Sequence, residues 1–329
     1  MTRIPDQIKK IVKKRICLLI HLNCTTDLNC QQCINIRQSP ALLKLKSYVF
    51  QTLNDVSQYN DDFLGMLQND HNIIPHLTRP LIQFASYSQL DKKTNSSQQY
   101  DQQQQESSSS HSLITQSLDL LERLISNNNI KICKVVINTP NALHSLCTLT
   151  NYKINIHFSQ EIDKQTFKIR DSSRGCLRRI QQCGDASAHT ELVNARYVKV
   201  LVIAISTASG SGVEQDYEIS HGLDKISEFI RCLNQGTYSF PPQPLLARRS
   251  DEQIEEEGEN EEIDSQLSNK GQNGHIKNSA NEAKAMILNY FIKQGNQRPY
   301  CHPIDSTAWE MEQGITSQSM QFTQSIKAK

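Results

Sequence analysis

The chain has little of what usually identifies an enzyme or a membrane protein. Glycine accounts for only 12 of the 329 residues, and there is a single tryptophan. Gly-x-Ser-x-Gly, His-Glu-x-x-His and Gly-x-x-x-x-Gly-Lys-Ser/Thr motifs are all absent. No apolar run approaches the roughly 18 residues that a membrane-spanning helix needs. These absences argue against an integral membrane protein and favour a protein without catalytic activity or cofactor.

An excess of charge of one sign is also missing. Lysine and arginine (35) balance aspartate and glutamate (34), so no overall field attracts nucleic acid or membrane. Two segments depart from this balance: residues 3–15 are basic, and residues 251–264 carry acidic side chains with no base among them. We hypothesise that the acidic run, tethered flexibly, competes with acidic partners for the basic segment.

The chain has ten cysteines. Its N-terminus interleaves apolar residues with lysines, unlike the uninterrupted apolar core of a signal peptide. We therefore expect a cytoplasmic or nuclear location, with the cysteines reduced and mostly buried.

Two polar runs divide the chain. Residues 91–112 are rich in Gln and Ser, and residues 250–280 contain EEEGENEEID. Such runs lack the apolar side chains needed to offset the entropy of ordering, so we predict both to be disordered. The implied organisation is a helical segment at 1–90, a central helical segment at 113–249, a terminal packing helix at 281–298 and a loose tail at 299–329.

Apolar residues recur at helical spacing in the segments between the polar runs. Proline at a first helical position and glycine after a last turn support several of the boundaries. The predicted core includes Leu120, Leu121, Leu124, Val200, Leu201, Ile203, Ile226, Phe229, Ile230, Ile287, Leu288 and Phe291. Helices are expected over residues 4–22, 40–57, 61–85 (two short helices punctuated by Pro75 and Pro80), 113–126, 130–137, 141–150, 171–183, 191–206, 219–236 and 281–295.

Two segments also fit strands. Residues 153–158 and 166–169 alternate apolar and polar side chains, which predicts a β-hairpin near 153–169. The segment 197–205 is rich in Val and Ile, so a buried strand is the alternative to a helix there. With strands also at 130–137, residues 130–235 would form a nucleotide-binding or small-molecule-binding α/β domain. Gly210 and Gly212 would then resemble a phosphate-binding turn, although Gln215 stands where a third glycine is needed.

Three segments share a further pattern. Each has a small residue (Ser173, Ala195 or Ala283) followed by a paired apolar ridge and a turn. This pattern resembles the final helix of armadillo or HEAT repeats, where a small residue permits close stacking on the next repeat. The segments start near residues 171, 193 and 280, so no single period of 40–47 residues relates them. The resemblance implies a mainly α fold, an irregular α-solenoid, with a surface that binds other proteins.

One candidate metal site stands out near the N-terminus. His21, Cys24, Cys30 and Cys33 offer four nitrogen or sulfur ligands within 13 residues, spaced His-x2-Cys-x5-Cys-x2-Cys. Structural zinc sites usually use two knuckles at more regular spacing, so free thiols in a helix–loop–helix are the favoured interpretation. Bound zinc would make residues 17–37 a nucleic-acid or ubiquitin-pathway module.

Two groups of basic side chains are candidate interaction surfaces. Each group lies on one face of its own predicted helix, and a face that is simply solvated is the simpler interpretation. The best overall hypothesis is an intracellular scaffold or adaptor that binds other proteins, with an acidic or phosphate-bearing ligand at the N-terminal basic face. The two groups are Lys9, Lys10, Lys13 and Lys14, and Arg174, Arg178 and Arg179.

Overall fold

The computed structural model describes residues 6–23, 30–58, 61–91, 100–126, 130–153, 159–207, 213–256, 258–269 and 275–289. Most of these residues are helical, and the extended pairing found among them is one isolated parallel bridge between Leu22 and Ile34. The prediction of a mainly α protein is confirmed. None of the described helices is both long and apolar enough to cross a membrane.

The N-terminal segment changes its helical pitch along its length. It runs through α1 (Asp6–Ile11), a π-helix η1 (Val12–Ile16) and a 3-10 helix η2 (Cys17–His21), where we predicted one regular helix over 4–22. The predicted division of faces is kept only in part: Val12, Cys17 and Ile20 are buried and Lys10 and Lys14 are exposed, but the apolar Ile11 is 59% exposed.

The rest of the described chain shows a recurring order of helices. The helices α2, α5, α8, α11 and α14 begin at residues 40, 100, 160, 213 and 275, so successive starts are 53–62 residues apart. Two helices lie between each of these recurring helices and the next, which gives a three-helix group. The bounds are α2 (Pro40–Ser57), α3 (Asp61–Asn69), α4 (Ile73–Asp91), α5 (Tyr100–Ser126), α6 (Ile130–Asn138), α7 (Ala142–Leu149), α8 (Gln160–Cys183), α9 (Ala186–Asn194), α10 (Tyr197–Thr207), α11 (Val213–Gln235), α12 (Pro244–Glu256), α13 (Glu259–Gln266) and α14 (His275–Asn289).

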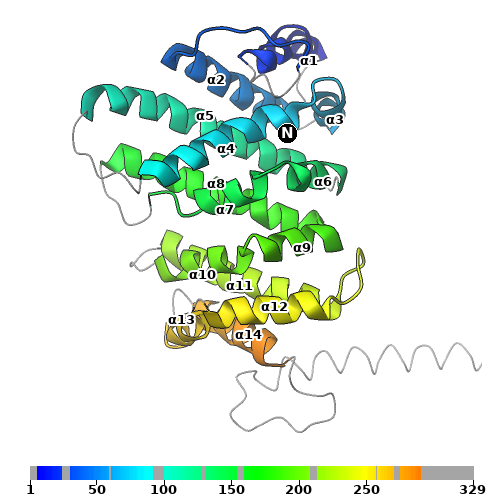
Figure 1. The fold of residues 1–329 in the computed structure, drawn as a ribbon, viewed down its shortest axis with the longest axis vertical. Helices are drawn as coiled ribbons and strands as arrows, with labels where there is room; N and C mark the ends of the chain where they lie inside the picture. Colours follow the sequence, from blue (N-terminus) through cyan, green and yellow to red (C-terminus); the bar gives the residue numbers. More distant parts are fainter. Residues whose placement is uncertain are drawn as a thin grey trace, which may run out of the picture. The chain divides into compact units, whose positions relative to one another are not determined.

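The described chain falls into two compact units. The first unit holds residues up to Val200 together with Thr237–Pro241, and the second holds Leu201–Gly236 and the residues from Pro242. Within the first unit, α2, α5 and α8 pack side by side, and α4 and α7 pack against α5 and α8 as a second layer (Figure 1). Leu118, Leu121 and Leu177 are fully buried in this unit.

Helices α5 and α8 are parallel. His111 contacts Gln165, Asp119 contacts Ser172, and Glu122 contacts Arg178, so the partners advance together along both helices. Small side chains lie at this interface: Ser173 is fully buried, and a Cβ on Gly175 would clash with the Glu122 carboxylate. The two helices can therefore approach closely over most of their length.

The second unit is organised around α11 and α14, which pack against each other, with α12 on α11 and α13 on α14. The α11 side contributes large apolar residues such as Phe229 and Ile226, and the α14 side contributes the fully buried Ala280, Ala283 and Ala285. Ser220 and Ser279 hydrogen-bond across the contact at 3.0 Å.

Local signals account for several helix ends. Ser39 caps α2 by accepting from the Leu42 N–H, with Pro40 in the first turn as predicted. Ser159 caps α8 in the same way through the Ile162 N–H. Gly236 follows α11 with a φ of 76°, a left-handed conformation that glycine adopts without strain.

The β predictions are wrong where the structure describes them. Residues 166–169 lie inside α8, 130–137 form α6, and 197–205 form α10, while residues 154–158 lie outside the described ranges. Helix α8 starts at Gln160, eleven residues before the predicted start at residue 171, because Ser159 and the acidic Glu161 and Asp163 provide an earlier start. The alternating pattern at 166–169 is too short to distinguish a strand from one helical face.

Three further helix predictions need correction. The two helices predicted over 61–85 are α3 and α4, but α4 continues past residue 85 to Asp91, with Pro80 inside it. The predicted helix over 191–206 is two helices, because the chain breaks at Ala195 and Arg196, and Arg196 has a φ of 57°. Ala195 is the C-cap of α9 and half-buried, so it does not share the fully buried positions of Ser173 and Ala283.

The described parts of the two polar runs are largely helical, where we predicted disorder. In the first run, α5 begins at Tyr100, His111 is buried, and Ser112 hydrogen-bonds Ser47 of α2 at 2.6 Å. Residues 92–99 lie outside the described ranges. Residues 111 and 112 therefore contact neighbouring helices, although they belong to the polar run.

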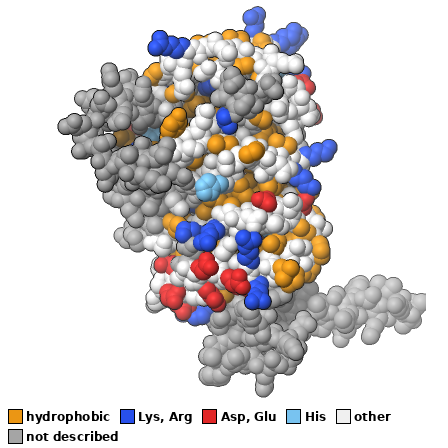
Figure 2. All heavy atoms as spheres, viewed as in Figure 1, with side chains coloured by type: hydrophobic (Ala, Val, Ile, Leu, Met, Phe, Trp, Pro, Cys, Tyr) orange, Lys and Arg blue, Asp and Glu red, His pale blue; other side chains and the backbone are white. Residues whose placement is uncertain are grey.

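The acidic run forms the end of α12 and most of α13, and Figure 2 shows acidic side chains gathered over these two helices. Asp251 is buried, Glu252 pairs with Arg248, and Asp264 pairs with Lys284 of α14. The run is therefore not a flexible tether, and the hypothesis that it competes for the basic segment loses its premise.

Most of the predicted core is confirmed. Ile203 is only half-buried, because it lies on the less covered side of α10. The side chains of Leu288 and Phe291 lie outside the described part. The nine buried members are Leu120, Leu121, Leu124, Val200, Leu201, Ile226, Phe229, Ile230 and Ile287.

Candidate metal centre and interaction surface

The candidate metal centre begins where η2 ends. The Leu22–Ile34 bridge returns the chain to η2: Ile34 N–H donates to the His21 carbonyl at 3.0 Å, and Asn23 N–H donates to the Ile34 carbonyl at 2.7 Å. A turn closed by Cys33 N–H on the Cys30 carbonyl precedes the bridge. These backbone contacts place Cys30 next to His21, nine residues earlier in the chain.

The tertiary structure adds histidines from a distant part of the sequence. The ligand atoms of His21, Cys30 and His76 all lie within 4.8 Å of one another. His21 Nδ1 is 3.2 Å from Cys30 Sγ, and its Nε2 is 3.2 Å from Nδ1 of His71. The rings of His21 and His76 meet edge to face, with centroids 4.9 Å apart. His76 comes from the first turns of α4, and His71 precedes that helix.

The histidines of this cluster are held neutral. Burial lowers the pKa of His76 to about 4, with the nearby His21 and Lys46 as further causes. Burial also lowers the pKa values of His21 and His71. A neutral imidazole has a free nitrogen lone pair at neutral pH, which is the form that binds a metal ion.

The predicted ligand set is thus only partly brought together. His21 and Cys30 meet, and Cys24 lies outside the described residues. Cys33 is outside the three-residue group, and its Sγ contacts Asn35 Oδ1 at 3.9 Å. His76 was not predicted, because the spacing pattern relates only ligands that are close together in the chain. The presence of two histidines in DHNIIPH was an available signal, but not a specific one.

A pocket of about 470 Å³ adjoins the cluster. Its lining combines cationic side chains with apolar ones, since Leu18 and Ile34 are 53% and 55% exposed. The lining residues are Lys13, Lys14, Leu18, His21, Gln32, Ile34, Asp70 and His71.

The N-terminal basic residues are partly available as a surface. Lys10 and Lys14 are exposed, whereas Lys13 forms an ion pair with Asp70 at 3.6 Å. Lys9 lies in α1, and its side chain is not described.

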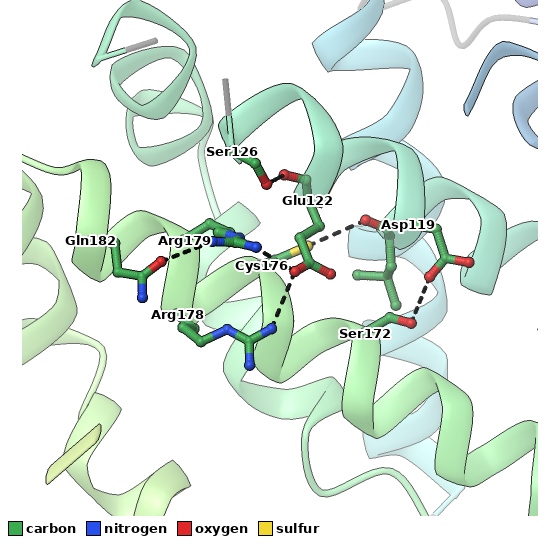
Figure 3. A network of polar contacts seen from close by, with 9 residues as sticks. Asp119, Glu122, Ser126, Ser172, Cys176, Arg178, Arg179 and Gln182 are labelled. Atoms are coloured by element: carbon green, nitrogen blue, oxygen red, sulfur yellow. Dashed lines mark hydrogen bonds and ion pairs between the residues drawn. The ribbon is translucent and has the colours of Figure 1, made fainter. Parts of the chain in front are cut away.

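The second basic group lies at the interface of α5 and α8 (Figure 3). Arg178 Nη2 donates to Glu122 Oε1 at 3.3 Å, and Arg179 Nε lies 3.6 Å from the same oxygen. Arg174 is half-buried on α8. Arg178 and Arg179 therefore contact Glu122 across the α5–α8 interface, and their role in binding a partner stays a prediction.

The same interface contains a thiol and a further carboxylate. Cys176 Sγ donates to the Leu118 carbonyl at 3.4 Å, and Ser172 Oγ donates to Asp119 Oδ1 at 2.7 Å (Figure 3). Burial raises the pKa of the Cys176 thiol well above its usual range. A thiol that stays protonated is a poor nucleophile, so this arrangement stabilises structure.

Burial affects other cysteines in the same way. The pKa of Cys17 is raised to about 11, and those of Cys133 and Cys147 to about 12. The eight cysteines of the described ranges carry no disulfide. Gly210 and Gly212, the candidate phosphate-binding turn, lie outside those ranges.

Comparison with known proteins returned no family model, no curated protein and no solved structure that matches this chain.

Proposed function

We propose that the protein is a non-enzymatic scaffold or adaptor of the cytoplasm or nucleus that binds other proteins through an irregular α-solenoid of the armadillo or HEAT type. The observation that carries the proposal is the three-helix group that recurs every 53–62 residues. Repeats of this class contain two or three helices in about 40–47 residues and stack on their neighbours to bury a continuous core. Long members such as α5 (27 residues) and α8 (24 residues) account for the larger spacing here.

The contacts between recurring helices support this proposal. Each unit has a closely packed pair with small polar residues at the contact: Ser47 with Ser112 in the first unit, and Ser220 with Ser279 in the second. Ser173 and Ala283, two of the small residues in the sequence resemblance, are fully buried on α8 and α14. Such positions let one helix stack on the next.

The partner site that fits best is the surface around the N-terminal pocket. Leu18 and Ile34 offer exposed apolar area, Lys14 lines the same pocket, and Lys10 is a second exposed cation of the same N-terminal segment. Peptides with an apolar anchor and acidic neighbours complement such a surface, because the anchor supplies affinity and the charges supply rate and specificity. The partner is therefore proposed to be a protein segment that combines acidic and apolar side chains.

Affinity capture with charge-reversed variants tests this function. The tagged full chain, the variant Lys10→Glu/Lys14→Glu and the matched control Lys164→Glu/Lys277→Glu are compared by quantitative mass spectrometry. All four lysines are exposed, so each pair changes the net charge equally. We expect a reproducible set of proteins that is lost from the first variant, retained by the control and weakened at about 0.5 M salt, where the Debye length falls to a few ångströms.

Two outcomes would contradict the proposal at different levels. If the wild type and both variants capture the same proteins, the pocket surface is not the partner site. If the folded chain captures no more protein than the heat-denatured chain does, the proposed scaffold function is wrong.

A further inference from the structure

We propose that His21, Cys30 and His76 bind a zinc ion, with His71 as an outer partner that orients His21. The proposal is independent of the scaffold function. It keeps two residues of the sequence-derived ligand set and replaces the others with histidines that the fold brings in from the region of α4.

The distances are those of a site that needs only small adjustments. Tetrahedral zinc with Zn–N of about 2.0–2.1 Å and Zn–S of about 2.3 Å places neighbouring ligand atoms roughly 3.3–3.6 Å apart. His21 Nδ1 and Cys30 Sγ are 3.2 Å apart, and the whole group lies within 4.8 Å. Side-chain rotations that move an atom by about an ångström therefore bring the three protein ligands to these spacings.

The three donor groups favour zinc over calcium and magnesium. Two imidazoles and one thiolate suit zinc, whereas calcium and magnesium prefer oxygen ligands. Asp70, the nearby carboxylate, forms an ion pair with Lys13. Binding converts the Cys30 thiol to a thiolate and releases one proton to solvent, while both histidines bind as neutral rings. The thiolate charge offsets the repulsion that Lys13 and Lys46 exert on a cation.

His71 has the geometry of an outer-shell residue. When Nδ1 of His21 faces the metal, its Nε2–H donates to His71 Nδ1, and the 3.2 Å distance already fits this bond. The fourth coordination position belongs to a water molecule or to a further side chain. His21 and His71 also line the pocket, so an exchangeable ligand has a route to that position.

A zinc ion at this site would cross-link two parts of the chain. His21 ends η2, Cys30 lies in the returning loop, and His76 lies 46 residues beyond Cys30 on α4. One ion thus ties the N-terminal segment to the first three-helix group, where short helices of irregular pitch offer little stability of their own.

Zinc and cobalt binding to the chelator-treated full chain tests the site. We expect one equivalent of zinc per chain and a cobalt complex with a thiolate charge-transfer band. Cys30→Ser and His76→Ala should each weaken zinc binding by at least about 100-fold, and His71→Ala by about 10–100-fold with unchanged stoichiometry. The matched controls are His144→Ala, on an exposed face of α7, and Cys232→Ser, on α11; both should bind zinc like the wild type.

Alkylation of the wild-type chain tests the proposal without any variant. One equivalent of zinc should slow iodoacetamide labelling of Cys30 at least about tenfold and leave Cys232 labelling unchanged, as peptide mass spectrometry would measure. Zinc at about 100 times its Kd should also raise Tm by about 5–10 °C. Equal labelling of Cys30 with and without zinc, or a charge-transfer band that persists in Cys30→Ser, would overturn the assignment.

Discussion

At the scale of single residues, function and stability depend on neighbours that are remote in the chain. One ring nitrogen of His21 contacts Cys30, and the other contacts His71. Burial lowers the pKa of His21, so its ring is neutral at neutral pH. A histidine at a helix end is common in protein sequences. Sequence spacing makes His21 a candidate ligand, and the fold adds His76 of α4 as a second histidine beside it.

Two glycines show how the same substitution has opposite effects in two environments. A Cβ on Gly184 would stand 2.5 Å from the backbone oxygen of Ile180 and would also clash with the Ala188 Cβ, whereas Gly65 has no atom within 4 Å of that position. We expect Gly184→Ala to lower the free energy of unfolding by about 1–3 kcal/mol, because backbone atoms must move. Gly65→Ala should raise it by about 0.4–1 kcal/mol, because α3 gains helix propensity.

Urea unfolding of both variants, followed by circular dichroism, checks this prediction. Because both glycines lie in the first unit, each variant acts as the control for the other. Equal midpoints for the two variants would show that Gly184 is not packed as described.

At the scale of elements, helix ends follow local capping, and helix lengths follow contacts with neighbours. Ser39 and Ser159 cap α2 and α8 by accepting from a backbone N–H three residues later. Helix α5 instead extends back to Tyr100, into the polar run, where Ser112 contacts Ser47 of α2. Amino-acid composition alone predicted disorder in this segment, because composition contains no information on the neighbouring helix that α5 contacts.

The acidic helix α12 carries a pH dependence of unusual sign. Asp251 is 8% exposed, and burial raises the pKa of its carboxyl to about 6, with Glu255 and Glu252 as further causes. The folded state therefore holds this proton more tightly than the unfolded state, whose pKa is near ~3.9. The contribution of Asp251 to stability is most favourable below about pH 4 and falls as pH rises through about 6.

Asp251→Asn removes this dependence. We expect the variant to be more stable than the wild type by roughly 1–3 kcal/mol at about pH 7.5, with the difference vanishing near pH 4. Thermal unfolding of both proteins at the two pH values measures it, and the subtraction cancels the other titrating groups. A constant difference across this range would mean that the Asp251 carboxylate is solvated in the folded protein.

At the scale of the whole molecule, the recurring three-helix group is the dominant feature. Recurring helices start 53–62 residues apart, and each unit packs its own pair or row of them. In stacked repeats, stability is roughly a sum of local and nearest-neighbour terms, so a perturbation stays local.

Hydrogen exchange of Leu118→Ala tests this locality. Leu118 is fully buried on α5, and its truncation should accelerate exchange in α5 and in the helices packed on it, α2, α4 and α8. Exchange in α14, which packs on α11 and α13, should be unchanged, as peptide-resolved mass spectrometry would record. Uniform acceleration through α14 would indicate one cooperative domain and would argue against a solenoid.

The sequence by itself determined the helical class, the start of α2 and most of the core, because these depend on periodicity and capping within one segment. The predicted α2 bounds of 40–57, the Ser39 cap and the buried Leu120, Leu121 and Leu124 are all confirmed. Signals of this kind act over a few residues, so a sequence pattern contains them directly.

Tertiary structure alone decided which remote residues meet. It brought His76 to His21 and Cys30, placed Arg178 and Arg179 against Glu122, and folded the acidic run into helices. The spacing of the three-helix groups could not be read from the sequence pattern either. Its small residues, Ser173 and Ala283, lie at different distances from the starts of α8 and α14. Contacts between residues so far apart in the chain depend on how helices stack, and no local periodicity encodes that stacking.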